Sequence, residues 1–397
     1  MRVLFLTHRL PYAPNRGDRL RAFHILKALR GRASVHLISL VHDDQEMAHQ
    51  GDLGDLAETV HVCAVPRLGN YVRGALSLLS TKPLTHSLLD SPGVMPAAVE
   101  VVERHRPDVV LSFCSGMAAF AIQPPLDQLP LVLDMVDVDS QKWRELAERS
   151  SFPLSVVYAR EARELSRFEA LVTNRACSTT VITRREEGAL RALAPTGRIV
   201  VSPNGLDADS FRAPGPPSQG RDIVFCGVMS YGPNADAAEW MAKKVWPIVH
   251  GVHAEARLLL VGAEPPNRVK ALANREDAIE VTGTVPDVRS YLWNAAAAVA
   301  PLHVARGTQN KVLEAIAAGL PVVVTDVVGD GLPEEVLPAC LVANSTEAFA
   351  EAVGRLLSMS PRERRAKASS AALEPLTWGN GLAPLLSALE DASLRRR

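Results

Sequence analysis

A lysine and a glutamate stand three residues apart, at Lys311 and Glu314, near the start of a short amphipathic segment. An ammonium group offsets phosphate charge, and a carboxylate accepts hydrogen bonds from vicinal sugar hydroxyls. A helix that begins at Asn310 would add free N–H groups and the positive end of its dipole, which also favour an anion. The spacing therefore predicts that Lys311 lies against phosphate and that Glu314 holds hydroxyls. The alternatives are a solvated first-turn lysine and an ordinary carboxylate on the helix face.

Regular elements on both sides would position these residues. Residues 299–302 are typical of the end of a buried strand, and Pro301 stops it because proline cannot donate to a sheet ladder. The turn 303–309 follows, then apolar residues at helical spacing over 310–318, Gly319 at the expected C-cap, and an apolar strand at 322–324. Because ligands of open parallel sheets collect at the carboxyl ends of strands, the turn before Asn310 is a candidate anion cradle.

The segment QNKVLEAIAAGLPVV, residues 309–323, resembles the signature of family 4 glycosyltransferases of the GT-B class. In that signature two acidic residues eight positions apart flank a loop that binds the donor diphosphate. Only the second acid, Glu314, is present here, and Arg306 stands at the first position. A loop of this kind resembles the sugar transferases associated with PEP-CTERM exopolysaccharide systems.

The resemblance implies a retaining transferase that uses a nucleotide-diphosphate sugar. It assigns leaving-group stabilisation to the helix start, Thr308, Gln309 and Asn310, and to the cations Lys311 and Arg306. Arginine only donates hydrogen bonds, so Arg306 would hold the diphosphate or an acidic donor sugar. A structural surface arginine is the third alternative.

The first loop and helix are locally basic, with eight Lys or Arg and one acid among residues 1–33. The loop follows the apolar strand 2–7, and Gly17 would let the backbone approach a ligand closely. We assign Gly17 to donor binding and Arg9, Asp18 and Arg21 to acceptor binding, as the resemblance of PYAPNRGDRLR to the same subset implies. A solvated basic face is the alternative.

A second polar cluster follows the apolar strand 131–136. Asp137 would lie at the carboxyl end of this strand and meet the acceptor hydroxyl, as the resemblance implies, with Ser140 beside it. A metal held by Asp137 and Asp139 is a second interpretation. Helix N-capping by Asp139 or Ser140 is a third.

Two further turns belong to the expected donor site. Gly227 follows the strand 222–226, and Asn234 lies near the start of the next helix, a position suited to phosphate contact in a Rossmann unit. Val285, in the turn 283–287, would hold the nucleobase through backbone groups, as the resemblance implies. Residues 291–298, with four alanines, are predicted to form a small helix.

Composition excludes several classes of protein. The 397 residues are 47% hydrophobic and 22% charged with a net charge of −1, so no global basic field indicates nucleic acid. The five cysteines are scattered, which indicates neither zinc nor disulfides and favours a reducing cytoplasm. We expect no metal, no cofactor, no signal peptide and no membrane span. Residues 67–89 mix Arg and Lys with Leu pairs and are typical of a lid, an interface helix or a lipid-facing helix.

Strand and helix alternation predicts an α/β protein of the GT-B type: two Rossmann-like, doubly wound parallel-sheet domains facing across a cleft. The expected limits are 1–205, a linker at 206–220, 221–379, and a helix at 380–397 that returns to the first domain. The expected partners are a nucleotide-sugar donor, a glycan or polyprenyl-linked acceptor, and the cytoplasmic face of the inner membrane as a peripheral contact. Two rival functions remain open: a nucleotide-sugar epimerase of the same architecture and a non-catalytic nucleotide-sugar-binding partner.

Overall fold

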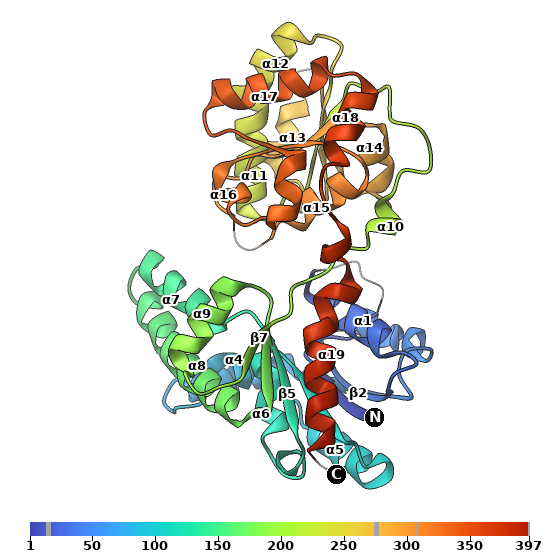
Figure 1. Cartoon of the computed structure of the whole chain (residues 1–397). Helices are drawn as coiled ribbons and strands as arrows, with labels where there is room; N and C mark the ends of the chain where they lie inside the picture. The colour runs from blue at the N-terminus through green and yellow to red at the C-terminus, as the bar shows by residue number, and fades with distance from the viewer. Residues whose placement is uncertain (13–16, 274–277, 306–307, 396–397) are drawn as a thin grey trace. The chain divides into compact units, whose positions relative to one another are not determined.

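The computed structural model describes residues 1–12, 17–273, 278–305 and 308–395. They form two compact units (Figure 1). Unit 1 comprises Met1–Asn204 and Trp378–Arg397, and unit 2 comprises Gly205–Thr377. Each unit contains one parallel sheet covered by helices, which confirms the predicted α/β class with two doubly wound sheets.

The sheet of unit 1 has seven strands in the order β3-β2-β1-β4-β5-β6-β7. Their bounds are β1 Arg2–Thr7, β2 Ser34–Val41, β3 Thr59–Ala64, β4 Val109–Phe113, β5 Leu131–Val136, β6 Ser178–Val181 and β7 Ile199–Val201. β4 is buried along its whole length because helices cover both faces of the sheet. The order reverses between β1 and β4, where ligands of such sheets bind.

The helices of unit 1 alternate with its strands. Their bounds are α1 Gly17–Leu29, α2 Asp44–Ala48, α3 Arg67–Ser77, α4 Leu84–Leu88, α5 Val94–His105, α6 Cys114–Ala121, α7 Asp139–Arg149, α8 Leu154–Arg175, α9 Arg184–Leu193 and α19 Trp378–Leu394, with short helices η1 Gln50–Leu53 and η2 Leu126–Gln128.

Alternating side chains of β1 divide the core of unit 1 into two layers. Val3 and Phe5 pack in the layer that contains residues of α1 and α19, whereas Leu4 and Leu6 pack in the layer that contains residues of α5 and α6. Trp378, the first residue of α19, stacks on His24 with ring centroids 4.2 Å apart. The last helix therefore completes one face of unit 1.

The sheet of unit 2 has six strands in the order β10-β9-β8-β11-β12-β13. Their bounds are β8 Ile223–Cys226, β9 Leu258–Val261, β10 Ile279–Gly283, β11 Ala297–Ala300, β12 Val322–Val324 and β13 Cys340–Val342. This is the strand order of a dinucleotide-binding Rossmann sheet, and its order reverses between β8 and β11.

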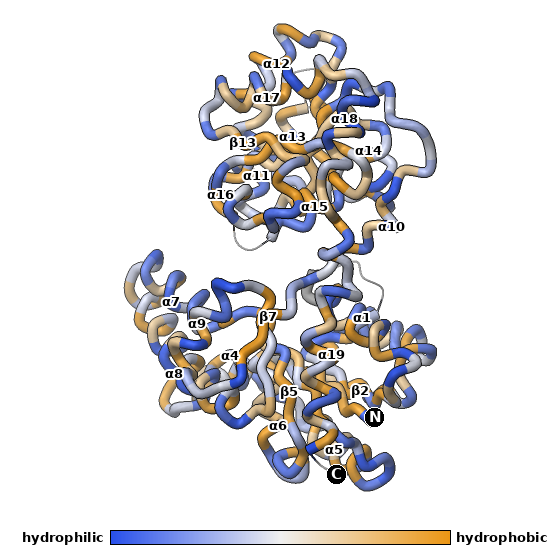
Figure 2. Tube along the Cα trace, in the orientation of Figure 1, coloured by the Kyte–Doolittle hydropathy of each residue, from blue (hydrophilic) through white to orange (hydrophobic). Residues whose placement is uncertain are grey.

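The helices of unit 2 cover both faces of that sheet (Figure 1). Their bounds are α10 Ala208–Phe211, α11 Gly232–Trp240, α12 Trp246–Val252, α13 Asn267–Ala273, α14 Arg289–Asn294, α15 Asn310–Ala317, α16 Asp326–Gly329, α17 Thr346–Ser358 and α18 Pro361–Ala368, with short helices η3 Met241–Val245, η4 Glu334–Ala339 and η5 Glu374–Leu376. Trp246 and Phe349 are the largest fully buried side chains here, together with Phe225. Figure 2 shows the expected pattern in both units, with largely apolar strands and helices that alternate between apolar and polar residues.

One expectation about unit 2 is wrong. The predicted small helix at 291–298 ends at Asn294, and Ala297–Ala300 form the buried strand β11. The segment predicted as a linker, residues 206–220, contains α10, and its backbone carbonyls accept bonds from Trp293 at Phe211 (2.7 Å) and from Arg364 at Gly220 (3.2 Å). A proline-rich segment can be fixed in this way because side chains from elsewhere satisfy its carbonyls.

Among the described residues, no helix is long and apolar enough to cross a membrane.

Candidate functional site

The helix α15, Asn310–Ala317, begins where it was predicted to begin and ends one residue earlier than predicted. Gln309 is its N-cap and Ala318 its C-cap, and Gly319 follows in the left-handed conformation with φ +88°. The N–H of Gly319 donates to Ile316 and that of Leu320 donates to Ala315, a Schellman motif. At its other end, the helix begins at the carboxyl edge of the sheet because it follows β11 in the chain. Its N-terminal N–H groups there suit an anion.

Lys311 is held in place by the first turn of unit 2. Its Nζ donates to Oδ1 of Asn234 at 2.7 Å, and Nδ2 of Asn234 donates to the carbonyl of Val228 at 2.8 Å. The ammonium also lies 4.9 Å from the ring centre of Phe225, a cation–π contact. Asn234 and Phe225, both far from Lys311 in sequence, thus fix this cation at the switch point between β8 and β11.

Two glycines make room for this arrangement. A Cβ on Gly227 would lie 3.0 Å from the Lys311 ammonium nitrogen and 2.9 Å from the side-chain nitrogen of Asn234. A Cβ on Gly262, whose φ is +152°, would lie 1.7 Å from the carbonyl oxygen of Gly227. A Cβ at Gly227 would push aside the side chains of Lys311 and Asn234, and a Cβ at Gly262 would displace the backbone of the turn that contains Gly227.

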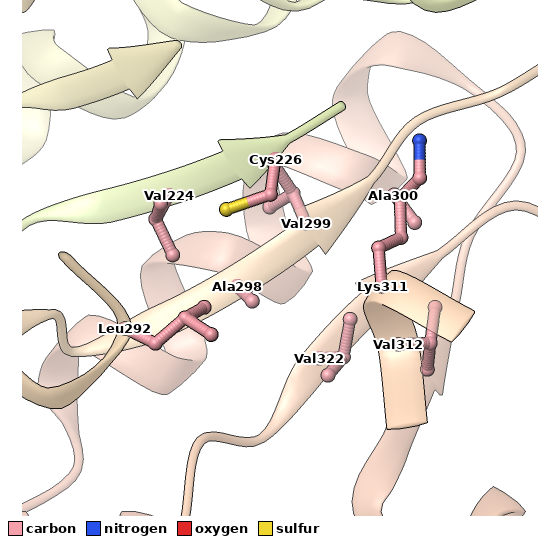
Figure 3. A pocket seen from close by; sticks show the side chains of 9 residues that line it. All are labelled: Val224, Cys226, Leu292, Ala298, Val299, Ala300, Lys311, Val312 and Val322. Atoms are coloured by element: carbon pink, nitrogen blue, oxygen red, sulfur yellow. The ribbon is translucent and has the colours of Figure 1, made fainter. Parts of the chain in front are cut away.

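A small pocket lies beneath this edge (Figure 3). In the figure the Lys311 ammonium extends past Ala300, at the end of β11, and away from Val224 and Leu292. The lining is apolar apart from Cys226 and Lys311. We therefore place the candidate anion site at the ammonium and the helix start, and attribute the pocket to core packing.

Burial changes the acid–base properties of three neighbouring groups. It lowers the pKa of Lys311 to about 8, although Cys226 and Glu314 oppose this shift. It raises the pKa of Glu314, against the attraction of Lys311, and it raises the pKa of Cys226 to about 12. A diphosphate placed beside the ammonium would supply an opposite charge and restore the pKa of Lys311.

The other predicted donor residues of unit 2 lie on the same sheet edge or outside the described part. Thr308 and Asn310 are half-buried at the start of α15. Val285 follows Gly283, which has φ +71°, and packs against the core of unit 2. Arg306 lies outside the described residues, so its predicted contact stays a prediction.

In unit 1 the predicted acceptor cluster is built around buried carboxylates. Asp137 is exposed just after β5, and Val136 before it has φ +66°, a strained conformation for a β-branched residue. Glu169 of α8, which is fully buried, accepts bonds from both the backbone N–H and the hydroxyl of Ser140. Glu186 of α9 accepts from the N–H of Val138 at 2.7 Å. These two carboxylates fix the turn that carries Asp137.

Two interpretations of this cluster need correction. Ser140 is fully buried and its hydroxyl is bound to Glu169, so it does not face an acceptor. Neither Asp139 nor Ser140 caps α7, because the N-cap is Val138 and it makes no side-chain capping bond. Burial raises the pKa of Glu169 to about 7 and also raises the pKa values of Asp139 and Glu186.

The basic first loop and helix are partly neutralised inside unit 1. Glu46, 1% exposed, accepts from Arg9 at 2.6 Å and also pairs with Arg19. Arg21 is buried and forms two bonds to Asp134, at 2.7 and 3.0 Å.

These contacts correct part of the acceptor assignment. Arg21 also donates to the carbonyl of Pro203, so its guanidinium holds unit 1 together and does not face an acceptor. Gly17 begins α1 and Asp18 follows it. Their predicted ligand contacts stay predictions, since neither side-chain environment is described.

Residues 220–359 match the family model of glycosyl transferases group 1. Comparison with curated proteins gives no match in sequence. The chain is similar in structure to sucrose-phosphate synthase from Thermosynechococcus elongatus, with a TM-score of 0.61 at 16% identity over 100% of this chain and 97% of that one. It is also similar to HepE of Anabaena in complex with UDP (0.66, 17%, 98% and 100%) and to WaaG, a glycosyltransferase involved in lipopolysaccharide biosynthesis (0.59, 19%, 98% and 98%).

The matched residues lie within unit 2. At these identities the solved structures show the fold alone, and that fold is GT-B. Lys311, Asn234, Gly227 and Glu314 all lie within the matched residues of this glycosyl transferases group 1 domain.

Sequence reasoning missed the buried carboxylates of unit 1. Leu165, Glu169 and Val172 stand at positions i, i+4 and i+7 of α8, so Glu169 lies within the apolar face of this helix. A carboxylate in such a stripe is costly unless it accepts hydrogen bonds, which is the signal that could have identified it. Glu46 had no comparable signal, because it lies in a short polar segment.

Among the described residues, no group of three or more His, Cys, Asp or Glu side chains could hold a metal ion.

Proposed function

We propose that the protein is a retaining glycosyltransferase that moves a hexosyl group from a nucleotide-diphosphate sugar to a glycan or lipid-linked acceptor. The observation that carries this proposal is the Lys311 ammonium, fixed by Asn234 beside Gly227 at the start of α15. A fixed cation and helix N–H groups at a switch point suit the charge that develops on a leaving diphosphate. They do this without a metal ion.

The other assigned residues have complementary roles in this proposal. Glu314, three residues further along α15, would accept hydrogen bonds from donor hydroxyls, which also offsets the cost of its burial. Asp137, exposed on its turn in unit 1, would meet the acceptor hydroxyl. The retaining outcome, the hexosyl donor and a role in exopolysaccharide or cell-surface polysaccharide biosynthesis rest on the resemblance of residues 306–323.

The test is an incubation with radiolabelled nucleotide sugars, with and without a polyprenyl-linked acceptor. UDP-sugars come first, because the similar HepE structure contains UDP. Label that moves to the acceptor supports the proposal. Conversion of the donor without an acceptor would indicate an epimerase, and donor binding without turnover would indicate a binding partner.

A thermal-shift panel of UDP-, GDP- and dTDP-sugars identifies the donor first, because a ligand of the folded state stabilises it by mass action. Lys311→Ala should lower the transfer that follows donor binding more than it lowers the shift produced by the correct donor. The matched control is Lys270→Ala, an exposed lysine on α13 of the same unit. Equal behaviour of the two variants would contradict the proposed site.

A further inference from the structure

The helix α3 of unit 1 buries its polar face and exposes its apolar face. Its inward face is polar or small: Asn70 and Ser77 are buried, and Gly74 lies between them at helical spacing. Its outward face is apolar and extends one turn beyond the helix, with exposed fractions from 63% at Val72 to 90% at Leu79. The outward apolar residues are Leu68, Tyr71, Val72, Leu76 and Leu79. A helix of a water-facing surface normally shows the opposite arrangement.

Specific contacts on the inward face of α3 fix which side of the helix points outward. Nδ2 of Asn70 donates to the carbonyls of Leu88 at 2.9 Å and Asp90 at 2.8 Å, which fixes the rotation of the helix. A Cβ on Gly74 would lie 2.9 Å from a methyl carbon of Leu84, so α4 packs directly against the helix backbone. The apolar face therefore points outward because of specific contacts on the other side.

The end of α3 is also clamped by α8. One guanidinium nitrogen of Arg160 donates to the carbonyls of Ser77 (2.6 Å), Ser80 (2.5 Å) and Lys82 (2.9 Å). The adjacent Glu161 is fully buried and accepts from the N–H groups of Leu84 and Thr85, at the start of α4. These hydrogen bonds fix the position of the helix that carries the exposed apolar residues.

The segment that carries this face has cationic side chains and no acidic ones. The sequence has no Asp or Glu from residue 59 to residue 89, a stretch that includes Arg67, Arg73 and Lys82. Arg73 and Lys82 are about half-exposed, and both lie 3.5 Å from the one carboxylate of Asp90. A single carboxylate leaves one of these two charges uncompensated. Apolar side chains with flanking cations and an exposed tyrosine match an anionic lipid surface.

We propose that the outward face of α3 binds an anionic phospholipid membrane, with Leu68, Tyr71, Leu76 and Leu79 entering the interface and Arg73 and Lys82 contacting lipid phosphates. This surface goes beyond the proposed transferase activity and does not depend on it. An exposed apolar face of this kind is costly in water, and contact with lipid removes that cost. The cations add attraction that acts only toward anionic lipid.

The test measures co-sedimentation of the full chain with vesicles, in the absence of donor and acceptor. Vesicles of phosphatidylethanolamine with phosphatidylglycerol are compared with vesicles of phosphatidylcholine alone. The double variant Leu68→Ser with Leu79→Ser should lower the partition coefficient on anionic vesicles by at least about tenfold. Each of Arg73→Gln and Lys82→Gln should lower it by about fivefold, and added salt should reduce it further.

The matched control is Val252→Ser, at a position in unit 2 that is 77% exposed. It should leave vesicle binding unchanged. Because all of the altered side chains are exposed, an unchanged melting temperature confirms that the variants fold. No binding of the parent to anionic vesicles, equal binding to phosphatidylcholine, or equal binding by the double variant would overturn the proposal. A parent dimer that the double variant dissociates, without vesicle binding, would assign the face to self-association instead.

Discussion

The carboxyl edges of the two sheets share a strand order but differ in charge. In unit 2 the edge between β8 and β11 presents a cation, Lys311, beside two glycines. In unit 1 the edge after β5 presents Asp137 on a turn held by the carboxylates of buried Glu169 and half-buried Glu186. The first arrangement suits an anion, and the second suits a group that donates a hydrogen bond or a proton. The residues at the strand ends, and not the fold, decide which chemistry each unit can support.

Burial acts on the two edges in opposite directions. It lowers the pKa of Lys311 to about 8 and raises the pKa of Glu169 to about 7, because in both cases it disfavours the charged form. The Lys311 ammonium has a neutral amide as its hydrogen-bond partner, so a ligand can supply the missing negative charge. The Glu169 carboxyl already accepts two hydrogen bonds from Ser140, so its partners come from within unit 1.

The largest effect is expected at the cationic edge. Lys311→Ala should lower kcat by about a hundred- to a thousandfold, the range seen when one group that stabilises transition-state charge is removed. Donor affinity should fall less, since the interaction strengthens as the diphosphate leaves. The measurement is kcat and KM for transfer, with Lys270→Ala as control. A variant that loses donor binding and turnover equally would show that Lys311 only binds.

The glycine beside Lys311 should be nearly as sensitive. Gly227→Ala places a Cβ about where the Lys311 and Asn234 side chains now meet, and a displaced catalytic group costs on the order of a hundredfold in rate. Gly232→Ala is the matched control, because a Cβ there meets no atom within 4 Å. Transfer rates and melting temperatures of both variants separate a local displacement from loss of folding. Full activity of Gly227→Ala would contradict the close fit.

The cationic edge could be predicted from sequence because its signals are local. The spacing of apolar residues, Pro301 and Gly319 predicts α15 within one residue at its C-terminal end, and that helix carries Lys311 and Glu314. Gly227 and Asn234 follow a predicted strand. The hydrogen bond between Asn234 and Lys311 joins residues 77 positions apart, and no sequence pattern predicts it. The alanines at 295–298 were misassigned because alanine favours helices, and burial within the sheet decided otherwise.

The acidic edge could not be predicted in the same way. Glu169 and Glu186 meet the turn after β5 from helices 29 and 48 residues away, and no local pattern indicates that either carboxylate binds this turn. The buried pairs Arg21 with Asp134 and Arg19 with Glu46 are equally long-range. The basic surplus of the first helix therefore suggested a ligand surface, although part of it is neutralised inside unit 1.

A moderate effect is expected at Glu314. Glu314→Gln should weaken transfer by about 1.5 to 3 kcal/mol, since a hydrogen bond to a charged group contributes that much. Folding stability should change little, because burial already raises the pKa of this carboxyl and the amide has the same shape. Transfer kinetics and chemical denaturation test both statements. Unchanged kinetics would return Glu314 to the role of a helix-face carboxylate, and the comparison would then rest on Lys311 alone.

The smallest effect is expected at the acidic edge, in the pH dependence of stability. The pKa of Glu169 is raised from 4.5 to about 7 by burial, so between these values the folded state binds more protons than the unfolded state. The free energy of unfolding should therefore fall as pH rises from 5 to 8, by roughly 2 kcal/mol from this carboxyl, and level off above about pH 7. Asp139 and Glu186 have raised pKa values and act in the same direction.

Glu169→Gln should thus reduce this slope without abolishing it, whereas Glu148→Gln, an exposed change on α7, should leave it intact. Denaturant unfolding at several pH values makes the measurement. A slope equal to the parent's in Glu169→Gln would mean that Glu169 is charged across this range. Burial would then not raise the pKa of this carboxyl, and the contrast with the lowered pKa of Lys311 would not hold.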